Sequence, residues 1–379
     1  VQALPYLMEF PHECSEQTFN RIYANSLARR IAMADPKIKK VFETWKAMEA
    51  QGGTALKSNL EKNESLKNAL LIETPWVLDA QDETARKHRV GLLFDSNRVD
   101  SELQRGLNRL RQMQLSDGAF PWFPGGRPSS FITLYITTGF GRLRHLGVDI
   151  EMDLALKAVG HLDSWIRDVY NHLKRLDLLS QVNIGYETAL YLYGRSFFLK
   201  ERPIPSASKE AVDYFLGQAE KYWLKVGSRM SQAHVALGLQ RFGRKEVPAK
   251  IVASLKERSV NDEELGLFWR DTEESWWWYR APIETQALMI EVFDEIANDA
   301  QAVEDAKVWL IKQKQTQDWK TSKATADAIY GLLLKGVDLL ASDKLVRAKL
   351  GGTDIQPPAN VEAGTGYYEV KYAPAEIKP

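Results

Sequence analysis

The sequence has a single cysteine among its 379 residues, which excludes an internal disulfide and gives no information on the redox compartment. It has no excess charge of either sign, because 50 Lys and Arg residues balance 50 Asp and Glu residues, so nothing favours nucleic acid or an anionic membrane surface as a partner. No apolar run is long enough to cross a bilayer. No ligand spacing predicts a metal or phosphate site. We therefore expect no cofactor, no metal, no nucleic acid and no membrane contact.

A starting methionine and a signal peptide are also missing, since the chain opens on Val1-Gln2-Ala3-Leu4. We expect it to be a piece of a longer polypeptide. By contrast, tryptophan is abundant, with 11 residues, which indicates a need for large and rigid apolar surfaces.

The lone cysteine, Cys14, lies three residues before Gln17, where a helix-like pattern begins. Residues three apart share a face of a helix, and the start of a helix favours a thiolate. A thiolate held against a carboxamide can displace ammonia and form an internal thioester, which is a reactive acyl donor. The alternative is a buried thiol that packs as a small hydrophobic side chain.

Helical periodicity runs from Ser15 to Ala34. A pattern typical of two paired helices then recurs about every 40 to 55 residues, a period typical of helical repeats. One helix of each pair begins with small or hydroxyl residues, and apolar residues follow. Small residues allow helices to approach closely, which favours an inner ring. Its partner is amphipathic, which favours an outer ring with one face in solvent. About six such pairs predict an all-α fold, an α/α toroid. The inner helices are expected near 129–146, 185–191, 231–237, 283–289 and 321–328, and the outer ones over 153–170, 209–225, 247–258 and 301–314.

After about Asp343 the pattern changes, because Gly-Gly and Pro-Pro pairs separate short runs with a period close to two, such as Gly366–Tyr372. These runs predict short strands that belong to an adjoining β-domain. We expect residues 1–342 to form the toroid and residues 343–379 to contribute the strands.

The stretch Phe10–Phe19 resembles the thioester signature of the alpha-2-macroglobulin and complement family, in which Cys-x-Glu-Gln follows a proline and precedes a hydrophobic residue. Asn20–Asn25 is similar to the bacterial branch, and 278–293 and 318–334 resemble the last two inner helices of the family. The resemblance implies a thioester domain inserted into a β-sandwich-like domain (CUB or macroglobulin-like). It also implies a periplasmic, cell-envelope or extracellular protease inhibitor rather than an enzyme, with target proteases and other domains of the parent chain as partners.

Such a thioester needs protection from water, and the tryptophans Trp122, Trp276 and Trp277 are candidates for a shield; the alternative is that they only close and stabilise the rim of the toroid. Complement thioester domains carry a downstream histidine that accepts the acyl group, which by resemblance makes His172 a candidate general base. The alternative for His172 is a polar histidine on a helix surface. His234, on an apolar helix, is expected in the core.

Two other functions stay open at this point. The same toroid carries enzymes that process glycosides or terpenoids, and Asp117, Glu187 and Glu284 are the acids expected near its mouth, although no clustered pair stands out. The third is a non-covalent interaction module in which the thioester never forms.

Overall fold

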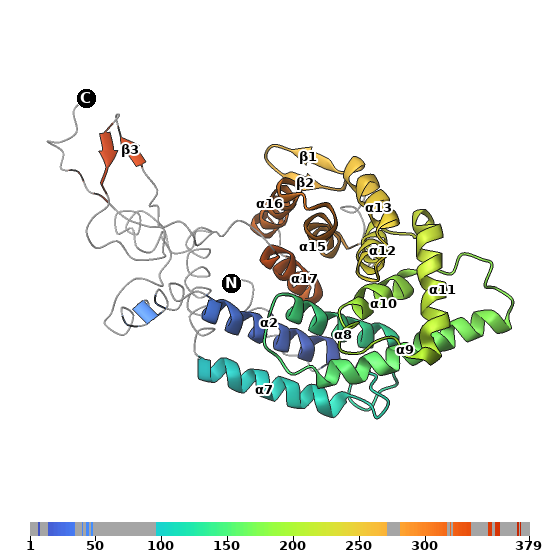
Figure 1. The fold of residues 1–379 in the computed structure, drawn as a ribbon. Helices are drawn as coiled ribbons and strands as arrows, with labels where there is room; N and C mark the ends of the chain where they lie inside the picture. The colour runs from blue at the N-terminus through green and yellow to red at the C-terminus, as the bar shows by residue number, and fades with distance from the viewer. Residues whose placement is uncertain are drawn as a thin grey trace. The chain divides into compact units, whose positions relative to one another are not determined.

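The computed structural model describes residues 14–34, 96–270, 281–316 and 321–334 without a break, together with 348–350, 353–356 and a few isolated positions. By internal contacts the chain divides into two compact units. One comprises Tyr6–Leu27 and Asp100–Gly336, and the other comprises Val1–Pro5, Ala28–Val99 and Val337–Pro379. The first unit contains almost all of the described helices, which are drawn in Figure 1.

Six of the described helices lie side by side in an inner ring (Figure 1). They are α2 (Ser15–Ala34), α8 (Ser130–His145), α10 (Tyr186–Ser196), α12 (Arg229–Arg241), α15 (Pro282–Val292) and α17 (Ser322–Leu333). Hydroxyl groups fix three of their starts, since Ser129, Ser228 and Thr321 each accept a hydrogen bond from a backbone N–H of the first turn.

Glycines allow these inner helices to approach one another closely. A Cβ on Gly139 of α8 would lie 2.2 Å from the ring of Phe19 on α2, and one on Gly194 of α10 would lie 2.3 Å from the hydroxyl of Thr138 on α8. Gly331 of α17 likewise faces the backbone of α15. The small residues of the sequence pattern therefore mark the faces on which the inner helices meet.

The outer helices alternate with the inner ones along the chain and are amphipathic. They are α7 (Ser96–Met113), α9 (Asp153–Arg175), α11 (Ser206–Tyr222), α13 (Glu246–Glu257) and α16 (Ala300–Thr316). In α9, for example, Ala155, Val159, Leu162 and Ile166 recur every three or four residues and are buried, while the opposite face is polar. The short segments η1 (Trp223–Lys225) and η3 (Phe293–Ala297) follow α11 and α15.

Strands are few among the described residues. The antiparallel hairpin of β1 (Val260–Asp262) and β2 (Gly266–Phe268) packs against α16, and a second hairpin pairs β3 (Ala348–Leu350) with β4 (Thr353–Ile355). In β2 all residues are buried, which anchors the loop after α13. The second hairpin lies in the tail for which short strands were predicted.

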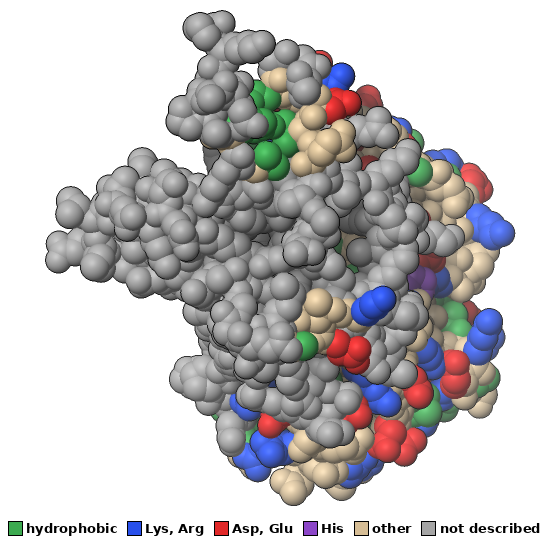
Figure 2. Space-filling view, turned by 90° about the vertical axis from the view of Figure 1, so that its left-hand side faces the viewer, with side chains coloured by type: hydrophobic (Ala, Val, Ile, Leu, Met, Phe, Trp, Pro, Cys, Tyr) green, Lys and Arg blue, Asp and Glu red, His purple; other side chains and the backbone are tan. Residues whose placement is uncertain are grey.

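The predicted fold class is confirmed: the protein is an all-α, toroid-like ring of helix hairpins with a few short strands. The strand Gly366–Tyr372 lies outside the described residues, and the predicted boundary near residue 342 stays a prediction. Side chains of both charges are interspersed on the described part of the surface in Figure 2, as the balanced composition leads us to expect. None of the described helices is both long enough and apolar enough to span a membrane.

Candidate functional site

All six inner helices line one small central cavity. Its volume of about 30 Å³ leaves room for about two water molecules. First-turn residues of α10, α12, α15 and α17 line it, such as Tyr186 in α10, Glu284 in α15 and Lys323 in α17. The first turns of α8 and α2 are hydrogen-bonded to those of α10 and α17, through Ser130–Glu187 and Ser322–Glu16. The inner helices therefore run in the same direction, and their N-termini gather at one rim of the ring. Cys14 precedes the first residue of α2 and so lies at this rim.

The structure brings the thiol of Cys14 over the first turn of α2. The backbone N–H of Gln17 donates to the Cys14 Sγ at 3.4 Å, and the Thr18 N–H donates to the Cys14 carbonyl at 2.9 Å. Cys14 is only 7% exposed, and the side-chain oxygen of Gln17 is buried without a hydrogen-bond partner among the described residues. A buried thiol and a buried, unpartnered carboxamide oxygen thus belong to the same turn of helix.

The thiol is less acidic than the sequence predicts. Burial raises the pKa of Cys14 above its ordinary value of 9.0, and the negative charge of Glu16 raises it further, which outweighs the hydrogen bond from the Gln17 N–H. The backbone N–H groups at the helix start do favour the thiolate, as predicted, but desolvation disfavours the charged form more strongly, so the net shift is upward.

Glu16 connects the first inner helix to the last. Its Oε2 lies 3.8 Å from the Cys14 Sγ, while its Oε1 accepts hydrogen bonds from Asn20 Nδ2 at 2.6 Å and from the hydroxyl of Ser322 at 2.8 Å. Ser322 is the first residue of α17, so this bond closes the ring between α17 and α2. Tyr135 of α8 adds a bond of 2.7 Å to Asn20 Oδ1, which fixes the amide that holds Glu16.

Aromatic side chains continue the rim next to Cys14. The carbonyl of Trp122 accepts a 2.9 Å hydrogen bond from the Ser15 N–H, so the loop of Trp122 is attached to the first residue of α2. The Trp122 indole is 44% exposed and stacks on Phe131, which stacks in turn on Tyr135. Trp276 and Trp277, the other two predicted shield residues, lie outside the described residues, and a shielding role for Trp122 stays a prediction.

The histidines differ in their surroundings. His172 is exposed in the last turn of the outer helix α9, and its role as a general base stays a prediction. His234 is 3% exposed, as expected of a core residue, and stacks on Tyr193 with ring centroids 5.1 Å apart. Burial lowers the pKa of His234 to about 3, with Arg142 and Lys323 acting in the same direction, so this imidazole is neutral at physiological pH.

The acids considered for a glycosidase-like or cyclase-like enzyme each have a partner of their own. Asp117 lies 3.1 Å from the His161 Nδ1, and Glu187 accepts from the hydroxyl of Ser130 at 2.9 Å. Burial raises the pKa of Glu284, which lies 3.4 Å from the Lys323 amine. The three acids thus serve three separate local contacts among the described residues.

A buried ion network that begins in the cavity wall joins four inner helices. Arg142 of α8 pairs with Asp327 of α17 and donates to the Tyr193 hydroxyl of α10 at 3.0 Å. That hydroxyl donates to Glu291 of α15 at 2.5 Å, and Tyr330 of α17 donates to the same carboxylate at 2.8 Å. No sequence motif pointed to this network, because its hydrogen-bonded pairs are 39 to 185 residues apart and only the ring brings them together.

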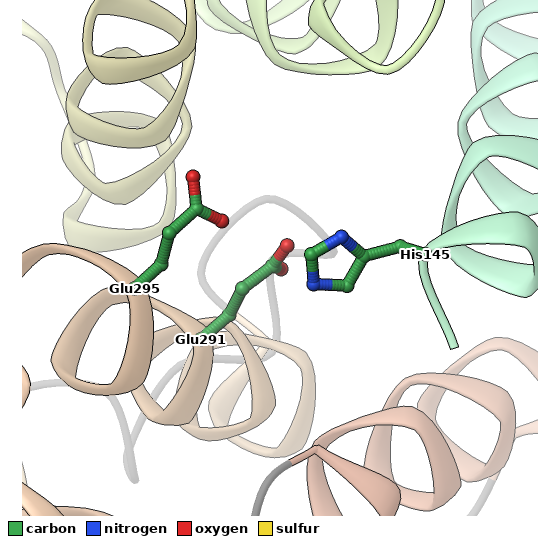
Figure 3. Close-up of side chains that lie close together, drawn as sticks. All are labelled: His145, Glu291 and Glu295. Carbon is green, nitrogen blue, oxygen red and sulfur yellow. The ribbon is translucent and has the colours of Figure 1, made fainter. Parts of the chain in front are cut away.

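A further cluster lies at the opposite rim, where His145, Glu291 and Glu295 point toward one another at the C-terminal ends of α8 and α15 and in η3 (Figure 3). Their nitrogen and oxygen atoms lie within 4.8 Å of one another. The guanidinium of Arg241 donates to both glutamates, at 2.6 Å to Glu291, and so already occupies the position of a cation. We describe this cluster as a structural ion pair.

The solved structures to which the chain is similar include native alpha-2-macroglobulin from Escherichia coli, spanning domain MG7 to the C-terminus (15% identity, TM-score 0.47), and a mutant of Salmonella alpha-2-macroglobulin (15%, TM-score 0.49). They also include the Salmonella protein reacted with methylamine (16%, TM-score 0.46). The chain is similar to bacterial alpha-2-macroglobulins. The matches cover 87 to 88% of this chain but only 41% of the Escherichia coli fragment and 17% of each Salmonella chain, so the chain spans less than half of these alpha-2-macroglobulin chains.

No protein-family model matches the sequence, and no curated protein matches it.

Proposed function

We propose that Cys14 and Gln17 form an internal thioester and that this chain is the thioester-bearing part of a bacterial alpha-2-macroglobulin-like protease inhibitor. The observation that carries the proposal is the position of the Cys14 Sγ over the first turn of α2, 3.4 Å from the Gln17 backbone nitrogen, together with a Gln17 side-chain oxygen that is buried and has no partner within the described region.

The chemistry divides into two steps. In the first step the Cys14 sulfur attacks the side-chain carbonyl carbon of Gln17, the carbon–nitrogen bond breaks, and ammonia leaves. In the second step a lysine amine or a hydroxyl of the trapped protease attacks the same carbon, the carbon–sulfur bond breaks, and the proton of the nucleophile ends on Cys14 as a free thiol. The protease is thereby acylated by Gln17. In this account the chain is a suicide inhibitor with a single turnover and not an enzyme.

The setting follows from the same account. A protease trap acts outside the cytoplasm, so we propose a periplasmic, cell-envelope or extracellular location. The β3–β4 hairpin and the rest of the tail from about residue 343 would belong to an adjoining β-domain of the parent chain. Trp122, beside the start of α2, is the described candidate to limit the access of water to the thioester.

The experiment is a measurement of the intact mass of the native chain, without denaturation and in a buffer that contains no amine. The proposal predicts a mass lower than the sequence mass by one ammonia molecule, and a thiol that becomes titratable only after methylamine is added. The Cys14→Ala variant must show the full sequence mass and no methylamine adduct. A native chain of full mass whose Cys14 thiol reacts at once with a thiol reagent would contradict the proposal.

A further inference from the structure

The contacts of Glu16 bear on how the thioester forms, a question that rests on the function proposed above. A thiol attacks an amide slowly unless a base removes its proton, and the buried Cys14 thiol is not a ready thiolate. The Cys14 thiol donates to Glu16 Oε2 at 3.8 Å, the only side-chain acceptor that the described structure shows for it. A carboxylate in hydrogen-bond contact with the nucleophile has the position that general-base catalysis requires.

We propose that Glu16 is the general base that activates Cys14 for thioester formation, and that Ser322 of α17 positions it. The proton moves from the Cys14 sulfur to Glu16 Oε2 as the new sulfur–carbon bond forms. The same proton then passes to the departing nitrogen of Gln17, which leaves as ammonia, so Glu16 is regenerated as a carboxylate. Every atom comes from Cys14, Gln17 and Glu16, and no further reagent is needed.

The positioning role of Ser322 follows from the hydrogen bonds that each carboxylate oxygen of Glu16 accepts. Asn20 and Ser322 both donate to Oε1, at 2.6 and 2.8 Å, which turns Oε2 toward the thiol. Asn20 is on the same helix as Glu16, but Ser322 comes from the last inner helix, 306 residues away in sequence. The base is therefore fully positioned only when α17 has docked on α2, which couples the chemistry to closure of the ring and keeps the thioester from forming in an incomplete fold.

The same rim offers a matched control. Glu187, in the first turn of α10, accepts from the hydroxyl of Ser130 at 2.9 Å, as Glu16 does from Ser322. No thiol contact is present at Glu187 in the described structure. Glu187→Gln and Ser130→Ala therefore reproduce the changes in charge and hydrogen bonding of Glu16→Gln and Ser322→Ala on a neighbouring helix, without touching the reacting atoms.

The test starts from full-length chain whose thioester has been opened with ammonia, which regenerates Gln17 and the Cys14 thiol. After removal of ammonia, closure is followed as the loss of the mass of one ammonia. We expect Glu16→Gln to close about 100-fold more slowly than the unmodified chain, as removal of a general base predicts. Glu16→Asp should recover part of the rate, because the shorter acid still accepts the proton. Ser322→Ala should slow closure about 10-fold, since it loosens the base without removing it, and the two control variants should close at the normal rate.

Three outcomes overturn the inference in different ways. If the unmodified chain closes and Glu16→Gln closes at the same rate, or is no slower than Glu187→Gln, the base is not Glu16, while the thioester itself stands. If the unmodified chain loses no ammonia in its native state, the proposed function fails and the inference fails with it. If Glu16→Asp closes the thioester as slowly as Glu16→Gln does, Glu16 has a purely structural role. Melting temperatures of all variants are measured as a control for folding.

Discussion

At the residue scale, the protein buries one ion pair almost completely, and this burial carries a desolvation cost. Arg195 and Asp163 are almost completely buried and form a two-pronged pair at 2.8 and 3.2 Å, and the Tyr191 hydroxyl donates to the same carboxylate. Removal of the arginine leaves a buried carboxylate without its counter-charge. We expect Arg195→Met to lower the free energy of unfolding by about 3–5 kcal/mol, as measured by urea denaturation.

The control for that prediction is Lys209, which pairs with Asp213 one turn away on the exposed face of α11. Exposed pairs of this kind contribute about 0.5 kcal/mol or less, so Lys209→Met should hardly change the free energy of unfolding. Equal effects for the two variants would mean that burial does not control the strength of these pairs.

At the same scale, sequence reasoning predicted that Cys14 and Gln17 lie close together but not which side chains surround them. Cys14 and Gln17 are neighbours on one turn, so a spacing of three predicts their proximity. Ser322 is far along the chain, and no local pattern links it to Glu16; only the closed ring does. The net upward shift in the pKa of Cys14 was not predicted for the same reason, since burial is a tertiary property that a short sequence motif does not encode.

At the scale of the element, close packing of inner helices depends on residues without a side chain. Because a Cβ at Gly139 would overlap the ring of Phe19, Gly139→Ala should push α8 away from α2 and lower the free energy of unfolding by about 1–3 kcal/mol. The matched control is Gly217→Ala in the middle of α11, where nothing lies within 4 Å of the new methyl group. That change should stabilise the protein by about 0.4–1 kcal/mol, because alanine loses less backbone entropy in a helix. Both are read from urea unfolding, and a neutral Gly139→Ala would contradict the packing account.

Helices were predicted well and the small hairpin was not. The helix Ser15–Ala34 and the inner and outer helices from 130 onward follow from apolar spacing and from the hydroxyl groups at their starts. The β1–β2 hairpin, Val260–Phe268, was missed because each strand has three residues, too few to show a period of two. Its Leu267 and Phe268 are held by tertiary burial against α16.

At the scale of the whole molecule, the buried ion network makes stability depend on pH. Burial by itself would raise the pKa of Asp327, but Lys323 and Arg142 outweigh it and hold the pKa below its ordinary value of 3.8. A carboxyl group whose pKa is lower in the folded state contributes stability that is complete above the unfolded pKa and is lost as pH falls through the folded one. The free energy of unfolding should therefore decline as pH drops below about 4.

The variant Asp327→Asn separates this group from the other carboxylates. It should be less stable than the unmodified chain at pH 7 and should lose less further stability on acidification, as measured by urea unfolding from pH 7 to pH 2. Asp213→Asn, at an exposed position, should not change the loss of unfolding free energy on acidification. The same acid slope in the Asp327→Asn variant and the unmodified chain would show that the network does not cause the pH dependence.

The most direct test of the central claim is to place an isotope-labelled methylamine on the native chain and locate it by peptide mass spectrometry, with alkylation of any released thiol. The thioester account predicts label on the side chain of Gln17 alone and alkylation of Cys14 only in the labelled molecules. Label on another residue, or alkylation of Cys14 without label on Gln17, would contradict it.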